Sequence, residues 1–183
     1  MISFTMIYKI KDISTDSSLM DDLRPKNKLY QDLKFTEKYF GGVLPFEVLI
    51  HIDPDKNKPS IETDILPYLD QVESLLQSEM QESRFFSLST LLRSIKRIRG
   101  DNGDEIYSYE MIERIAQEQS KQGNRLISDD KTVFRVTGLI ENRTSSEMKK
   151  VYNKLDSLSR SFPPYLSIEC TGTTVVALRT NDY

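Results

Sequence analysis

Two strand–helix–strand patterns, one in each half of the chain, constrain the fold more than any other feature. Alternating apolar and polar residues are typical of a half-buried strand, and apolar residues three or four apart are typical of an amphipathic helix. The expected elements are a strand at 46–52, a helix at 63–80, a strand at 84–88, a strand at 132–141, a helix at 145–162 and a strand at 165–171.

This order predicts an α+β fold of the ferredoxin-like type, β-α-β-β-α-β. Right-handed crossovers would place both long helices on one face of an antiparallel sheet. A helical insertion at 89–131 separates the second and third strands, and it contains a predicted helix at 108–119. An extra strand at 2–10 and an extra helix ending at Phe40 precede the first unit.

The ends of the helices carry recognisable signals. Pro25 and Asn27 open the first helix, and Gly41-Gly42 stops it. We expect that helix to bury a stripe of Leu29, Leu33 and either Tyr30 or Tyr39. The expected N-caps of the later helices are Thr63, Ser89 and either Ser145 or Ser146. Their buried stripes are expected to be Ile65, Leu69, Val72, Leu76 and Met80 in the first long helix and Met148, Val151, Leu155, Leu158 and Phe162 in the second.

The length of 183 residues favours one domain. We divide it into an N-terminal strand and helix (1–45), a first β-α-β unit (46–88), the insertion (89–131), a second β-α-β unit (132–173) and a closing segment (174–183). Apolar residues make up 38% and charged residues 29%, which is typical of a folded domain in water.

The charge balance argues against a nucleic-acid partner. The net charge is -3, and a nucleic-acid-binding domain usually has a basic face. One short basic stretch, which acidic residues follow, is interpreted as a solvated helix face; it contains Arg93, Lys96, Arg97 and Arg99.

The residues do not form a recognisable catalytic or metal set. His51 is the only histidine, and we expect it on the strand face opposite Val48 and Ile50. A metal site of His51, Asp53 and Asp55 is disfavoured because Pro54 separates the acids and no second histidine helps. Phosphate-binding glycine motifs are also missing from the sequence. The prediction is therefore a protein that is not an enzyme, with no cofactor and no metal.

The remaining candidates are expected to belong to the core or to a binding surface. Cys170, the one cysteine, excludes a disulfide framework and is expected to be a buried small thiol. Phe85, Phe86 and Tyr107 are expected either to line a binding surface or to fill the core, and no residue is assigned to a substrate.

The chain contains neither a membrane-spanning run nor a signal peptide. No stretch reaches the roughly 18 apolar residues of a span, and the alternating start Met1–Tyr8 has no cleavage site. If Met1 is the natural start, these observations indicate the cytosol.

Several segments together resemble the extracytoplasmic loop of RND-superfamily exporters, closest to the MMPL-like branch. Residues 27–54 read NKLYQDLKFTEKYFGGVLPFEVLIHIDP, with a helix that ends at Phe-Gly-Gly, a proline and a strand. A helix like residues 65–80, a short strand with serines before a helix (85–98) and a Thr-Gly turn (170–173) follow in the family's order. The resemblance covers about residues 9–180, but the usual aspartate after Ser89 is missing and residues 100–125 carry no family signature.

The resemblance implies a periplasmic porter domain on the outer side of the bacterial inner membrane. Such a domain would form part of the path for hydrophobic or amphipathic substrates, including lipids, and its partners would be transmembrane helices of the same parent chain. The proton-relay residues of these exporters lie in those helices, so none transfers to this sequence. Residues 174–183 would lead into the next span, and Met1 would not be a natural start.

Two other hypotheses remain open from the residues alone. The first is a stand-alone cytosolic ferredoxin-like module that binds a small ligand or a protein. The second is an enzyme centred on Glu47, His51 and Asp53, which we consider much weaker. The substrate and the oligomeric state are not predicted.

Overall fold

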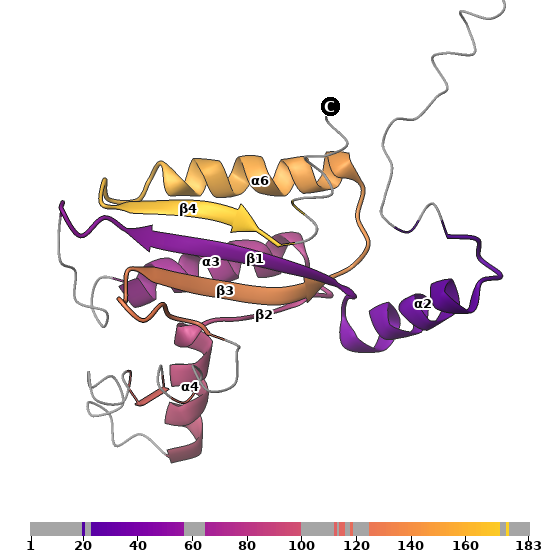
Figure 1. Ribbon diagram of the computed structural model, residues 1–183, viewed down its shortest axis with the longest axis horizontal. Helices are drawn as coiled ribbons and strands as arrows, with labels where there is room; N and C mark the ends of the chain where they lie inside the picture. Colours follow the sequence, from indigo (N-terminus) through magenta and orange to yellow (C-terminus); the bar gives the residue numbers. More distant parts are fainter. Residues whose placement is uncertain are drawn as a thin grey trace, which may run out of the picture.

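The fold is α+β and is built on a four-stranded antiparallel sheet (Figure 1). The computed structural model describes residues 20, 23–56, 65–99, 112, 114–115, 118, 125–172 and 175. The strands are β1 (Leu44–Ile52), β2 (Arg84–Phe86), β3 (Val133–Ile140) and β4 (Leu166–Thr171), in the spatial order β2-β3-β1-β4. The four predicted core strands are therefore confirmed, with small shifts at their ends.

The register brings the apolar residues of all the strands to one face. Ile50 of β1 pairs with Phe134 of β3 and with Ile168 of β4, so these three side chains lie side by side. Phe46, Val48 and Ile50 are fully buried, as are Phe134 and Val136. Because side chains alternate along a strand, the other face carries the polar residues between them.

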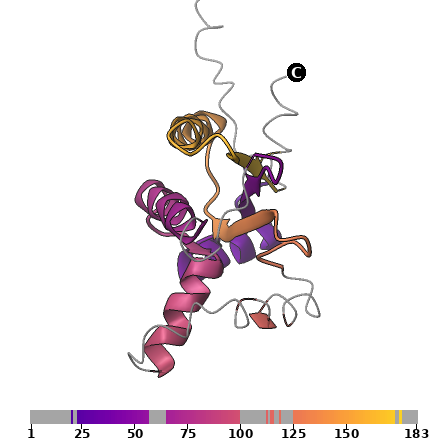
Figure 2. The ribbon, with the colours of Figure 1, turned by 90° about the vertical axis from the view of Figure 1, so that its left-hand side faces the viewer.

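Two helices cover this apolar face (Figure 2). They are α3 (Leu66–Glu79) and α6 (Ser145–Ser159), which also contact each other. As expected, the apolar stripe of α3 is buried, and α6 buries Met148, Val151 and Leu155. Leu158 is only partly buried. The prediction that both long helices lie on one face is confirmed.

The start of α6 differs from the prediction. Thr144, not Ser145 or Ser146, is the N-cap: its hydroxyl accepts a hydrogen bond from the Glu147 amide. The Glu147 side chain in turn accepts from the Thr144 amide, which completes a capping box. Three adjacent hydroxyl residues compete for the cap, and the glutamate three positions after Thr144 decides between them.

The insertion between β2 and β3 begins with α4 (Leu88–Arg99), as expected. Its cap is Ser87 rather than Ser89, because the Ser87 hydroxyl accepts from the Ser89 amide. The predicted helix 108–119 lies mostly outside the described residues, although Ile112 and Ile115 within it are helical and buried. The predicted strand 2–10 and cap Thr63 also lie outside them.

Helix α2 (Lys28–Phe40) precedes the sheet and projects from one end of it (Figure 1). Its predicted ends are confirmed: the Asn27 side chain accepts from the Leu29 amide, and Gly41 closes the helix with a φ of 78°. The predicted buried stripe is wrong, since no residue of α2 is buried. The expected stripe residues Leu29 and Tyr39 are instead 53% and 62% exposed.

Candidate functional site

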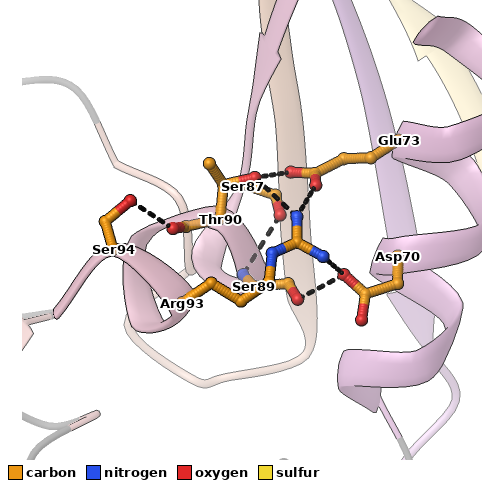
Figure 3. Close-up of polar contacts among 7 residues, drawn as sticks. All are labelled: Asp70, Glu73, Ser87, Ser89, Thr90, Arg93 and Ser94. Carbon is orange, nitrogen blue, oxygen red and sulfur yellow. Dashed lines mark hydrogen bonds and ion pairs between the residues drawn. The ribbon is translucent and has the colours of Figure 1, made fainter. Parts of the chain in front are cut away.

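A polar cluster joins α3 to α4 at the start of the insertion (Figure 3). The Arg93 guanidinium donates to Asp70 and to Glu73, with nitrogen–oxygen distances of 2.5 and 2.6 Å. The Ser89 hydroxyl donates to Asp70, and the Thr90 hydroxyl donates to Glu73. Two carboxylates of α3 thus receive donors from three residues of α4.

The cluster is arranged to hold two helices together. Glu73 is only 8% exposed, and a buried carboxylate is costly unless donors surround it. The expectation of a solvated helix face for the basic stretch holds for Arg93 and Arg97, which are both exposed, although Arg93 also pairs with α3. A local signal was present in the sequence, because Asp70 and Glu73 are three residues apart and share a helix face.

The open face of the sheet carries the other candidate residues. Nε2 of His51 lies 3.2 Å from Oε2 of Glu169 on the neighbouring strand. Glu47 pairs instead with Arg135, at 3.5 Å between Oε1 and Nη1. Glu47 and His51 are four positions apart, which is about 13 Å along the strand. His51 and Glu47 are therefore held in two separate pairs.

Asp53 lies past the end of β1 and belongs to a turn. It pairs with Lys56 at 2.8 Å, and its side chain also accepts from the Asp55 amide at 3.1 Å. The hydrogen bond from Lys56 lowers the pKa of Asp53 below its ordinary value. Within the part of the chain that the structure describes, no three His, Cys, Asp or Glu side chains lie together as a metal-binding group.

The remaining sequence candidates lie in or beside the core. Cys170 is half-buried on the helix-covered face, opposite Val48, so the expectation of full burial is corrected to partial burial. Phe85 is half-buried and packs edge-on against the Phe46 ring, 6.4 Å between centroids. Phe86 points to the open face and is 39% exposed. Tyr107 lies outside the described residues.

An open cleft of about 520 Å³ lies between α2 and the rest of the protein. Its lining is mostly charged and consists of Lys34, Glu37, Lys38, Glu82, Glu141 and Asn142. The Glu37 carboxylate accepts from the Asn142 amide at 2.6 Å and from Lys34 at 2.5 Å. The hydrogen bond to Glu37 raises the pKa of Lys34. Glu37 thus attaches α2 to the rest of the protein through the Asn142 amide beside this cleft. No sequence pattern indicated this contact.

The outer side of α2 is apolar and uncovered. Four of its large side chains are more than half exposed: Leu29, Phe35, Tyr39 and Phe40. They make up four of the seven exposed large apolar residues among those the structure describes. Elsewhere on the body, single exposed apolar residues such as Ile98 are ordinary.

Comparison with known proteins adds no relative: no protein family, no curated protein and no solved structure matches the chain. Of the helices in the described ranges, none has the length and apolar character needed to cross a bilayer.

Proposed function

We propose that this chain is the extracytoplasmic porter domain of an RND-type, MMPL-like exporter, built on a ferredoxin-like β-α-β-β-α-β core. In this role the domain forms part of the path for hydrophobic or amphipathic substrates on the periplasmic side of the inner membrane. Transport energy comes from transmembrane helices of the parent chain, so the domain itself is not an enzyme.

The observation that carries the proposal is the position of the segments that resemble the family. The Phe40-Gly41-Gly42 break coincides with the end of α2, where Gly41 has a φ of 78°. The Thr171-Gly172 turn coincides with the end of β4, where Gly172 has a φ of 106°. Both glycines therefore occupy backbone conformations that other residues rarely adopt, which gives these weak sequence motifs a physical role.

The strand order supports the ferredoxin-like core. Helix α3 connects β1 to β2, and β3 lies between those two strands. Helix α6 connects β3 to β4, and β1 lies between those two. Each unit is thus a split β-α-β, and both crossover helices cover the same face (Figure 2). The insertion that begins with α4 is an addition to this plan.

The parent reading frame gives the first test. We expect apolar segments of about 20 residues to be encoded on both sides of residues 1–183. A stop codon directly after Tyr183 together with a ribosome-binding site before Met1 would instead support the stand-alone cytosolic module and would refute the porter assignment.

Labelling in whole cells gives the second test. Ser167 is exposed on the open face of β4, so Ser167→Cys in a Cys170→Ser background adds one accessible thiol to this domain. A maleimide that cannot cross the inner membrane should label this thiol in intact cells with a permeable outer membrane. Labelling that requires lysis of the inner membrane would place the domain in the cytosol. The Cys170→Ser parent without the new cysteine is the control for background.

A further inference from the structure

The uncovered side of α2 has the geometry of a single docking face. At 100° per residue, Phe35, Tyr39, Leu29 and Phe40 fall within an arc of about 140°. Lys28, Asp32 and Thr36 lie inside the same arc, between these side chains. Phe35 and Tyr39 also touch each other, with ring centroids 4.5 Å apart. Glu37, which attaches the helix to the body through the Asn142 amide, lies outside this arc. The apolar side therefore faces away from the protein.

Basic residues outnumber acidic ones on and beside this face. Residues 24–40 hold five Lys or Arg and two Asp or Glu, in a chain whose net charge is -3. Lys34 is paired with Glu37. The other basic residues are all exposed: Arg24, Lys26, Lys28 and Lys38. Asp32 is the one exposed acid of α2. The excess of basic residues is thus confined to residues 24–40, because Asp21 and Asp22 come shortly before them.

We propose that α2 is a membrane-surface helix that binds anionic phospholipid. Its aromatic and leucine side chains enter the boundary between headgroups and acyl chains, and its basic residues contact the headgroup phosphates. An apolar arc rich in aromatic residues, with lysines beside it, is the pattern of helices that lie in this interface. Long lysine side chains reach the headgroups while their stems stay against apolar surface.

A lipid surface fits this helix better than a second copy of the chain. A twofold dimer through α2 would place the same patch, with its excess of basic over acidic residues, on both sides of the contact. A layer of anionic headgroups offers the opposite charge. The helix also projects from one end of the sheet, where a flat surface can reach it (Figure 1).

The proposal does not rest on the exporter assignment and is tested on the 183-residue chain alone. The chain is mixed with vesicles of phosphatidylcholine containing about one quarter phosphatidylglycerol, and the bound fraction is measured by sedimentation. We expect binding that weakens with salt and is much weaker to pure phosphatidylcholine. The chain has no tryptophan, so Phe40→Trp provides a single tryptophan whose emission should shift to the blue on binding.

The decisive variant removes the apolar face without touching the core. The triple change Phe35→Ser, Tyr39→Ser and Phe40→Ser should weaken vesicle binding by at least about tenfold. Its thermal unfolding should match the wild type, because all three side chains are exposed. The matched control is Ile98→Ser on α4, an 85% exposed apolar residue outside the face, which should bind as the wild type does.

A wild-type chain that does not bind the mixed vesicles would overturn the proposal, and so would a triple variant that binds them equally well. A dimer seen by sedimentation velocity without lipid and lost in the triple variant would instead assign the face to a second copy. Lys28→Glu with Lys38→Glu should abolish the preference for anionic vesicles, and an unchanged preference would also contradict the proposal.

Discussion

Helices α2 and α3 are neighbours in the chain and similar in length, with 13 and 14 residues, yet the protein uses them in opposite ways. Helix α3 buries its apolar stripe against the sheet and its polar side against α4. Helix α2 buries no residue and keeps its apolar side outward. The comparison teaches that an amphipathic pattern predicts a helix with an apolar face. The pattern does not predict whether that face packs against the sheet or stays exposed.

The largest effect is expected from equivalent truncations in the two helices. Leu69→Ala in α3 empties a fully buried position and should lower the free energy of unfolding by about 2–5 kcal/mol. Leu29→Ala in α2 should cost less than about 0.5 kcal/mol because the side chain is already exposed. Urea denaturation measures both values. Similar losses for the two variants would mean that α2 is packed in solution and would break the comparison.

The joint between α2 and the sheet gives the next effect. The φ of Gly41 is 78°, and a Cβ added to it would lie 2.2 Å from the Glu82 carbonyl oxygen. Gly41→Ala should therefore cost about 1–3 kcal/mol in thermal unfolding. Gly172→Ala is the control, since its φ is 106° but its nearest neighbour is 3.1 Å away. An equal loss at both glycines would show that the contact with Glu82 contributes nothing.

The polar side of α3 gives a smaller effect. Arg93→Ala leaves the nearly buried Glu73 without its guanidinium partner and should cost about 1–2 kcal/mol, limited by the half-exposed arginine. Arg160→Ala removes an ion pair whose partners are 78% and 61% exposed, so its expected cost is below about 0.5 kcal/mol. Chemical denaturation measures both costs. Equal costs would mean that the polar cluster does not hold α3 and α4 together.

The smallest effect is expected at the attachment of α2. Glu37→Gln weakens the bond to the Asn142 amide and should cost below about 1 kcal/mol. Glu37 raises the pKa of Lys34, so the pair stabilises fully below the ordinary lysine pKa and less as pH rises through the raised value. As pH rises through this range, the free energy of unfolding should therefore fall less for the variant than for the wild type.

An alkaline series of unfolding curves checks this prediction. Asp53→Asn is the matched control, because Asp53 raises the pKa of Lys56 in the same way and leaves Lys34 unaffected. Each variant should remove its own share of the decline. An unchanged alkaline limb in Glu37→Gln would mean that the Lys34–Glu37 pair does not hold α2 in solution.

Most elements of the body could be predicted, because their signals lie within a few residues. Alternation located β1, β3 and β4, and the spacing of Leu69, Val72 and Leu76 located α3. The choice of cap was less certain wherever several hydroxyl residues stand together. Thr144 prevails over Ser145 because Glu147 completes the reciprocal pair of hydrogen bonds, and Ser87 caps α4 in place of Ser89.

The partners of the polar contacts could not be predicted from sequence patterns. Arg93 reaches Asp70 across 23 residues, and Asn142 reaches Glu37 across 105. Asp70 and Glu73 share a helix face, but no pattern indicates which residues they bind, since charged residues are usual on solvated faces. The sequence candidates His51 and Glu47 illustrate the converse, because one strand face holds them in separate pairs.

By itself, the sequence determined the order and type of the body's elements, the face that each strand and long helix buries, and the glycine that ends α2. These features depend on side-chain periodicity and on local backbone freedom, which act over one or two turns of chain. Only the tertiary structure decided the order of the strands, the polar cluster that joins α3 to α4, and the exposure of the apolar side of α2. Those depend on which surfaces remain to be covered once the sheet is assembled, and no local pattern records that.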